Sequence, residues 1–276
     1  MSGALPTRTV EKPWGRAVLP APFVAPVGSR IGEIWFEPPP ELPSLLVKYI
    51  FTSEKLSVQV HPDDAQALAS GDGANGKEEC WLVIDAEPGA TLGVGFRDRL
   101  SSGQIRAAAL DGSIEDLLVW HPVSANDFFY IPANTVHAIG AGISLIEVQQ
   151  NADITYRLYD YGRPRELHLD AGVAVARGEP HAPGLRFQVP DAGTVKLAEG
   201  RYFTLHRLDG EPDAELRAAY SGPLLVVPQR GAVRIGGEVL EPGSCGWAAG
   251  IGEVGFAADG QCLIARPAGQ PETLRR

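Results

Sequence analysis

The residues of this chain best suited to binding a metal begin with a glutamine and a histidine two positions apart, Gln59 and His61. They lie in the stretch Ser57–Asp64, where β-branched and polar residues alternate before Pro62, a pattern that predicts a strand ending at the proline. Successive strand side chains point to opposite faces, so Ser57, Gln59 and His61 share one face and valines fill the other. Such a polar face offers nitrogen and oxygen ligands to a metal, although a solvated strand face has the same pattern.

A second possible nitrogen ligand, His137, follows a strand and a turn. The stretch Asp127–His137 begins with apolar residues, continues through a turn started by Pro132, and reaches the histidine at the start of a returning strand. Asn134 stands where a positive φ is often required, and asparagine enters the left-handed region comparatively easily. The pattern predicts a β-hairpin that carries His137.

Carboxylates and cations occur at defined distances from these residues. Lys77, Glu78 and Glu79 begin a predicted strand, in which only one of the two glutamates can reach the interior because neighbours face opposite sides. Further along, Glu147 precedes Arg157 by ten residues. By residue type alone, Arg157 fits a surface arginine and Glu147 fits its ion-pair partner.

The elements that must position these residues are mainly strands. Alternation predicts strands over residues 31–36, 45–51, 56–60, 77–84, 128–131, 143–148 and 154–159. Asp63 is predicted to cap a short helix, and residues 99–119 are predicted to form two helices broken at Asp111–Gly112. After about residue 175, short strands at 222–228, 232–235 and 262–265 indicate a second β sandwich or barrel. We therefore expect a domain over residues 1–175 with the site and a structural β domain over residues 176–276.

Composition limits the classes of partner. At 276 residues, with 44% hydrophobic and 21% charged residues, the chain has the make-up of a globular protein. The net charge of −10 argues against nucleic acid and against an anionic membrane, but permits a small anionic substrate if cations are placed locally. Four of the five lysines, all but Lys196, lie within the first 77 residues.

Neither targeting nor disulfide formation is expected. No apolar run approaches the roughly 20 residues of a membrane span, and the first residues lack the apolar stretch of a secretory signal, which favours a cytoplasmic location. Cys80, Cys245 and Cys262 are too scattered for a disulfide framework and are expected to be reduced thiols.

Taken together and in order, these motifs resemble one family of the cupin superfamily, the type I mannose-6-phosphate isomerases in their short bacterial form. The resemblance runs from about Glu11 to Arg157. It rests on the motifs Glu11-Lys12-Pro13-Trp14-Gly15, Val47-Lys48-Tyr49, Ser57-x-Gln59-x-His61-Pro62, Lys77-x-Glu79, His137 and Glu147…Arg157. The chain departs from the general cupin pattern by having Asn126 and Asn134 at two positions where glycine is usual, and Gln59-x-His61 in place of His-x-His.

The resemblance implies two tandem cupin-like β-barrels and one zinc ion per chain. The implied zinc ligands are Gln59, His61, Glu79 and His137. Two nitrogen and two oxygen ligands suit Zn²⁺, and a catalytic role then requires a fifth position open to water or to sugar hydroxyls. His121 and His168 have no partner at ligand spacing and are expected to be surface or packing residues.

The implied reaction interconverts mannose 6-phosphate and fructose 6-phosphate through an enediol(ate). It needs a base and an electrophile for the developing oxyanion. Arg157 and Lys77 would add positive charge, and Glu147, Lys77 and zinc-bound water all remain possible bases. Ser57 and Lys48 are expected to bind the phosphate, and Trp14 and Lys12 to wall the pocket mouth. The expected partner is a small sugar phosphate, with neither nucleic acid nor membrane, and the chain is expected to be a monomer or a small homo-oligomer.

Two alternatives stay open at this point. One is another cupin enzyme, either an isomerase or epimerase of a different sugar or an iron oxygenase, although oxygenases more often use two histidines and one carboxylate. The other is a sugar- or metal-binding cupin without catalytic activity.

Overall fold

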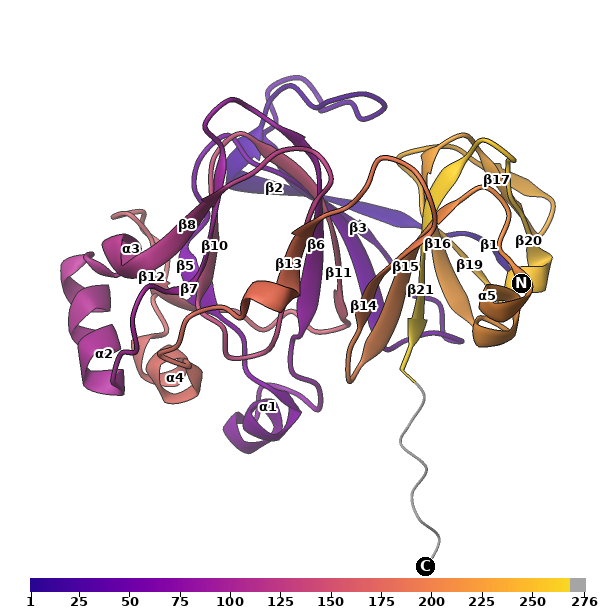
Figure 1. Ribbon diagram of the computed structural model, residues 1–276. Helices are drawn as coiled ribbons and strands as arrows, with labels where there is room; N and C mark the ends of the chain where they lie inside the picture. Colours follow the sequence, from indigo (N-terminus) through magenta and orange to yellow (C-terminus); the bar gives the residue numbers. More distant parts are fainter. Residues whose placement is uncertain (269–276) are drawn as a thin grey trace, which may run out of the picture. The chain divides into compact units, whose positions relative to one another are not determined.

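The structure is a computed structural model that describes residues 1–268, and antiparallel strand pairs dominate it (Figure 1). This confirms the mainly β fold class. Packing divides the chain into two compact units: a larger one of residues 9–35 and 47–188, and a smaller one of residues 1–8, 36–46 and 189 onward. The domain division expected after residue 175 and the closure of each unit into a barrel remain predictions.

The larger unit is built on two sheets. In spatial order, the seven-stranded sheet contains β13 (Arg186–Gln188), β9 (Asp127–Ile131), β6 (Glu79–Ala86), β11 (Ile143–Gln150), β4 (Leu45–Phe51), β3 (Ile31–Phe36) and β2 (Thr7–Arg16). The five-stranded sheet contains β12 (Tyr156–Tyr159), β5 (Val58–Val60), β10 (His137–Ile139), β7 (Thr91–Phe96) and β8 (Leu118–Pro122). The strands predicted at 31–36 and 45–51 have these bounds.

Two apolar clusters lie on opposite faces of the five-stranded sheet. The first joins Leu92 and Ile139 of this sheet to Trp81 and Phe129 of the seven-stranded sheet. The second lies on the other face, where the fully buried Val58 and Val60 pack with helix residues such as Ile105. Because strand side chains alternate, the valines that face the helices leave Gln59 to face the space between the sheets.

The helices of the larger unit begin and end where local chemistry predicts. Asp63 caps α1 (Asp64–Ser70) with a capping box to Gln66, and Gly71 ends it at φ 80°. Gly112, at φ 85°, separates α2 (Ser102–Asp111) from α3 (Ile114–Leu117), so the predicted break is confirmed. α4 (Leu169–Val175) and a 3₁₀ turn (Pro183–Leu185) complete the unit. Within residues 1–268, none of the helices combines the length and the apolar character needed to cross a membrane.

The smaller unit also has two sheets. Its six-stranded sheet contains β1 (Gly3–Ala4), β19 (Gly246–Ala248), β16 (Leu224–Arg230), β21 (Gln261–Pro267), β15 (Phe203–Asp209) and β14 (Val195–Glu199). Its three-stranded sheet contains β18 (Glu238–Leu240), β17 (Val233–Ile235) and β20 (Val254–Gly255). Residues such as Val226 and Ile264 of the first sheet pack with Ile235 of the second, and α5 (Ala214–Ala219) and a 3₁₀ turn (Ile251–Glu253) complete the unit.

Candidate active site

Strand register brings distant residues of the five-stranded sheet into one row. β5 lies between β10 and β12, and Gln59 stands directly opposite His137 on one side and Arg157 on the other. Directly opposed residues project to the same face, so these three side chains share the interior face of the sheet. The positive φ expected at Asn134 is observed, at 72°, in the turn that leads into β10.

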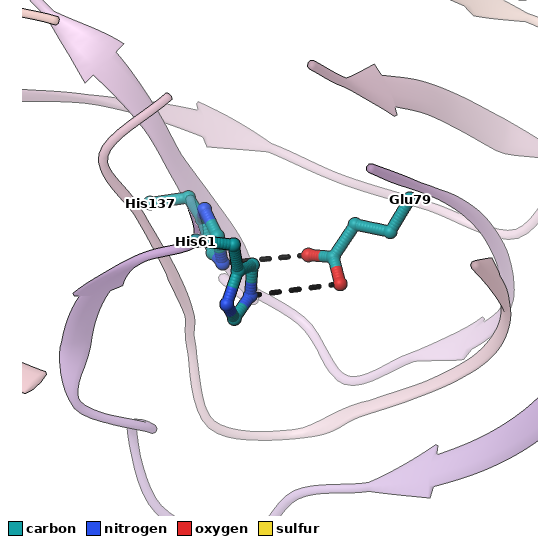
Figure 2. Close-up of side chains that lie close together, drawn as sticks. All are labelled: His61, Glu79 and His137. Carbon is teal, nitrogen blue, oxygen red and sulfur yellow. Dashed lines mark ion pairs between the residues drawn. The ribbon is translucent and has the colours of Figure 1, made fainter. Parts of the chain in front are cut away.

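Three side chains converge on one point between the two sheets (Figure 2). His61 directly follows β5, His137 begins β10, and Glu79 begins β6 of the opposite sheet. His137 Nε2 lies 3.4 Å from Glu79 Oε1, and His61 Nε2 lies 3.7 Å from Glu79 Oε2. All three residues are at most 1% exposed, and their possible ligand atoms lie within 4.8 Å of one another.

Backbone carbonyls fix the two imidazoles in the form that a metal requires. His61 Nδ1 lies 2.6 Å from the carbonyl oxygen of Ile154, and His137 Nδ1 lies 2.9 Å from that of Thr135. A carbonyl can only accept, so each Nδ1 carries the proton and each Nε2 keeps its lone pair. Such bonds orient metal-binding histidines. Both Nε2 atoms therefore face Glu79 as acceptors.

Burial also holds the imidazoles neutral. Desolvation lowers the pKa of His137 to about 3, with Glu79 opposing the shift, and desolvation and Lys77 lower the pKa of His61. Burial alone would raise the pKa of Glu79, but the ammonium group of Lys77 opposes it, and that pKa lies well below the usual range. A charged carboxylate and two neutral imidazoles are thus present together.

Glu79 still has an unused ligand atom. Its Oε2 accepts a hydrogen bond from Lys77 at 2.5 Å, whereas its buried Oε1 accepts none within the described part of the chain. A buried carboxylate oxygen without a donor is costly unless a cation completes its environment. The group His61, Glu79 and His137 could therefore hold a metal ion.

Gln59 lies beside this group. Its Nε2 donates to His137 Nε2 at 3.2 Å, and its Oε1 accepts from Ser57 Oγ at 3.1 Å. A ligand role requires the reversed amide, with Oε1 beside the imidazole, because an amide nitrogen has no free lone pair. Ser57, expected at the phosphate, has its hydroxyl bonded to Gln59 in this structure.

A compact network of buried charges adjoins the metal group. Lys77 Nζ lies 3.7 Å and Lys48 Nζ 3.4 Å from Glu147 Oε1, while Glu147 Oε2 accepts from Trp81 Nε1 at 3.0 Å. Lys48 also sits 3.9 Å from the centre of the Trp35 ring. These charged side chains are at most 5% exposed, so each depends on its neighbours for compensation.

The network shifts the pKa values of its members in different directions. Burial and Glu79 raise the pKa of Glu147 despite the nearby lysines. Burial opposes protonation of Lys77, but Glu147 and Glu79 outweigh it and raise its pKa. Burial and Lys77 lower the pKa of Lys48 despite Glu147. Lys77 therefore stays protonated and positively charged, whereas the pKa of the Glu147 carboxyl group is raised above its usual range.

A pocket of about 340 Å³ opens beside this network. Eight predicted site residues line it: Lys12, Trp14, Lys48, Ser57, Gln59, Lys77, Glu147 and Arg157. The three remaining ones, His61, Glu79 and His137, form the metal group behind it. Trp14 is only 2% exposed and packs in the core, while Lys12 pairs with Glu33 at 3.4 Å.

Sequence reasoning missed further lining residues. Glu33, Asp153, Thr155, Arg165 and His168 also line the pocket. His168, expected at the surface or in packing, lies at the pocket because its backbone N–H donates to the carbonyl of Arg157 at 2.8 Å. The sequence did contain a signal for Glu33. An acidic residue within the apolar strand Ile31–Phe36 is expected to be buried, and a buried acid is expected to have a charged partner.

Comparisons with known proteins agree with this geometry, although no family model matches the chain. The chain is 38% identical over 201 residues to the mannose-6-phosphate isomerase of Streptococcus mutans, covering 69% of this chain and 62% of that protein. It is 34% identical over 234 residues to the mannose-6-phosphate isomerase ManA of Bacillus subtilis, covering 80% and 74%. The chain thus spans less than two thirds of the length of the first relative.

Solved structures extend the likeness to almost the whole chain. The crystal structure of mannose 6-phosphate isomerase from Bacillus subtilis superposes with a TM-score of 0.79 at 25% identity, covering 96% of this chain and 99% of that one. A putative mannosephosphate isomerase from Archaeoglobus fulgidus superposes with a TM-score of 0.74 at 19% identity, which shows a shared fold alone.

Proposed function

Because this chain belongs to the mannose-6-phosphate isomerase family, we propose that it interconverts mannose 6-phosphate and fructose 6-phosphate with the aid of one zinc ion. The observation that carries the proposal is a buried His61–Glu79–His137 group directly behind a pocket that contains both lysines and arginines. A volume of about 340 Å³ falls in the range of small-molecule sites.

The residues proposed to hold zinc are His61, Glu79 and His137, with Gln59 as the fourth. Two imidazole nitrogens, one carboxylate oxygen and one amide oxygen form a donor set that suits Zn²⁺. When bound, zinc would supply an electrophile that stabilises the oxygen of the developing enediolate. Ser57 would then act by orienting the Gln59 amide.

Glu147 is proposed to move the proton. In the direction from mannose to fructose, its carboxylate takes the proton from C2, and the C–H electron pair forms the C1–C2 double bond as the carbonyl pair moves to O1. Return of a proton to C1, with loss of the O2 proton and gain of one on O1, gives the ketose. The raised pKa of Glu147 makes it a stronger base than an ordinary carboxylate, and the hydrogen bond from Trp81 Nε1 fixes the orientation of its carboxyl group.

Lys77 and Arg157 are proposed to stabilise negative charge rather than to take protons. The raised pKa of Lys77 keeps it protonated, which makes it a poor base. Lys77 bridges Glu79 and Glu147 and therefore holds the metal group and the base at a fixed separation. Arg157 stands beside Gln59 across the sheet and lines the pocket, which supports a role in binding negative charge of the substrate.

A substrate panel tests the proposed reaction. The zinc-loaded chain is incubated with mannose 6-phosphate, glucose 6-phosphate and unphosphorylated mannose, and the ketose product is measured in each case. We expect efficient conversion of mannose 6-phosphate alone. Preference for a different sugar phosphate would replace the substrate assignment, and zinc binding without turnover of any sugar would indicate a binding protein.

A further inference from the structure

The positive charge near the metal group is already offset by carboxylates. Lys48 and Lys77 both face Glu147, Lys77 also bonds to Glu79, and Glu33 lowers the net charge further. These lysines therefore leave little free charge for a dianionic phosphate. The surplus of positive charge in the pocket lies elsewhere.

That surplus is carried by Arg157, Arg165 and His168, which line the same pocket. Arg157 donates through Nε to the carbonyl oxygen of Glu166 at 2.8 Å, and it forms no ion pair within 4.0 Å in the described part of the chain. Arg157 and Arg165 line the same pocket, and burial together with the charge of Arg165 lowers the pKa of Arg157 despite Asp160 and Glu166. Two neighbouring like charges favour an anion that binds both.

His168 adds a neutral donor to these charges. Its Nδ1 accepts from the backbone N–H of Arg157 at 3.2 Å, so the ring proton of the neutral imidazole lies on Nε2. Burial and Arg157 lower the pKa of His168, which keeps the ring neutral. One imidazole N–H and two guanidinium groups are therefore available at this part of the pocket.

Asp160 holds the side chain of Arg165 at this part of the pocket. This carboxylate is 2% exposed and accepts from Arg165 Nε and Nη2, each at 2.6 Å, in a bidentate pair. It also accepts from Arg163 Nη2 at 2.7 Å. Arg163 also pairs with Glu54 at 3.8 Å, and of these two arginines only Arg165 lines the pocket.

We propose that Arg165, positioned by the buried Asp160, is a substrate-binding residue that holds the phosphate together with Arg157 and His168. This inference rests on the proposed function, because it identifies the anion as the phosphate of the sugar substrate. The phosphate then lies at the segment that follows β12, and Ser57 and Lys48 remain at the metal end of the pocket with the sugar. Arg165 thereby selects phosphorylated over unphosphorylated sugars.

The test compares Arg165→Gln with Arg163→Gln. Both changes remove a guanidinium from the same Asp160 and leave it one arginine partner, so their effects on charge are matched. Arg163 also donates to the carbonyl of Lys55 at 2.7 Å and pairs with Glu54 at 3.8 Å, so a loss of stability alone would be at least as large in Arg163→Gln. For each zinc-loaded full-length variant, isothermal titration calorimetry measures the affinity for inorganic phosphate, and steady-state kinetics gives KM and kcat for mannose 6-phosphate. Circular dichroism checks that both variants are folded.

We expect Arg165→Gln to weaken phosphate binding and to raise KM by about 10- to 100-fold, the range for a lost hydrogen bond to a charged group, with a smaller change in kcat. Arg163→Gln should stay within about twofold of the wild type. Equal phosphate affinity in wild type and Arg165→Gln would overturn the inference, and so would an equal loss in both variants. If the wild type shows this binding pattern but does not isomerise mannose 6-phosphate, the phosphate site stands and the proposed reaction fails.

Discussion

Replacing Lys77 by methionine should expose how strongly the buried carboxylates depend on it. Lys77 is 5% exposed, and its ammonium group lies 2.5 Å from Glu79 Oε2, 3.7 Å from Glu147 Oε1 and 3.2 Å from His61 Nε2. Methionine keeps most of the side-chain volume and removes the charge. Removing one partner from a buried ion-pair network typically lowers the free energy of unfolding by about 3–5 kcal/mol, because an uncompensated charge remains buried.

We therefore expect metal-free Lys77→Met to lose about 3–5 kcal/mol in free energy of unfolding, measured by urea titration with circular dichroism in the presence of a chelator. Zinc should recover part of this loss, because a bound cation would compensate Glu79 in place of the ammonium group. The matched control is Lys55→Met, which removes a lysine 46% exposed that pairs with Glu115 at the surface and should cost about 1 kcal/mol or less. If the two variants were equally stable without metal, Lys77 would not be the cation that stabilises these carboxylates.

Three further predictions follow from the site. His137→Ala and Glu79→Ala should both lose zinc and turnover, measured by metal analysis and activity, and an active variant that survives chelation would remove that residue from the metal site. Arg157→Ala should keep zinc and lose at least about tenfold in kcat/KM, and wild-type kinetics would exclude Arg157 from the reaction. Between pH 6.5 and about 3 the unfolded chain binds a proton at residue 137 that the folded chain does not, so the stability of the metal-free protein should fall as the pH falls. The slope should approach about 1.4 kcal/mol per pH unit for this group and should decrease in His137→Asn; an unchanged slope would show that His137 does not stay neutral.

Local sequence patterns predicted parts of the metal group, whereas its full set, including Glu79 of the opposite sheet, came from the family resemblance. Strand alternation alone places the side chains of Gln59 and His61 on the face opposite to the two valines. Pro62 then ends the strand directly after His61. Asn134 at φ 72° confirms the turn expected before His137. Each of these features depends on a few neighbouring residues, which a single sequence contains.

The rest of the pocket depends on contacts between distant segments. Lys48 was expected at the phosphate, but no local pattern indicates that Glu147, 99 residues later, lies 3.4 Å from its ammonium group. Arg165 and His168 lie at the pocket only because the chain after β12 folds back onto Arg157 through Asp160 and backbone hydrogen bonds. β2 was likewise not predicted, since Pro13 interrupts a sequence that alternates poorly.

We propose that zinc bound by the buried histidine–glutamate group is needed for isomerisation of mannose 6-phosphate. The most direct test is a zinc titration of the chelator-treated chain, with turnover of mannose 6-phosphate followed in a coupled assay at each addition. We predict negligible turnover without metal, a linear rise with added zinc, and a plateau at one zinc per chain that Glu79→Ala never reaches. Full turnover in the metal-free chain, or a plateau shared by Glu79→Ala, would contradict the claim.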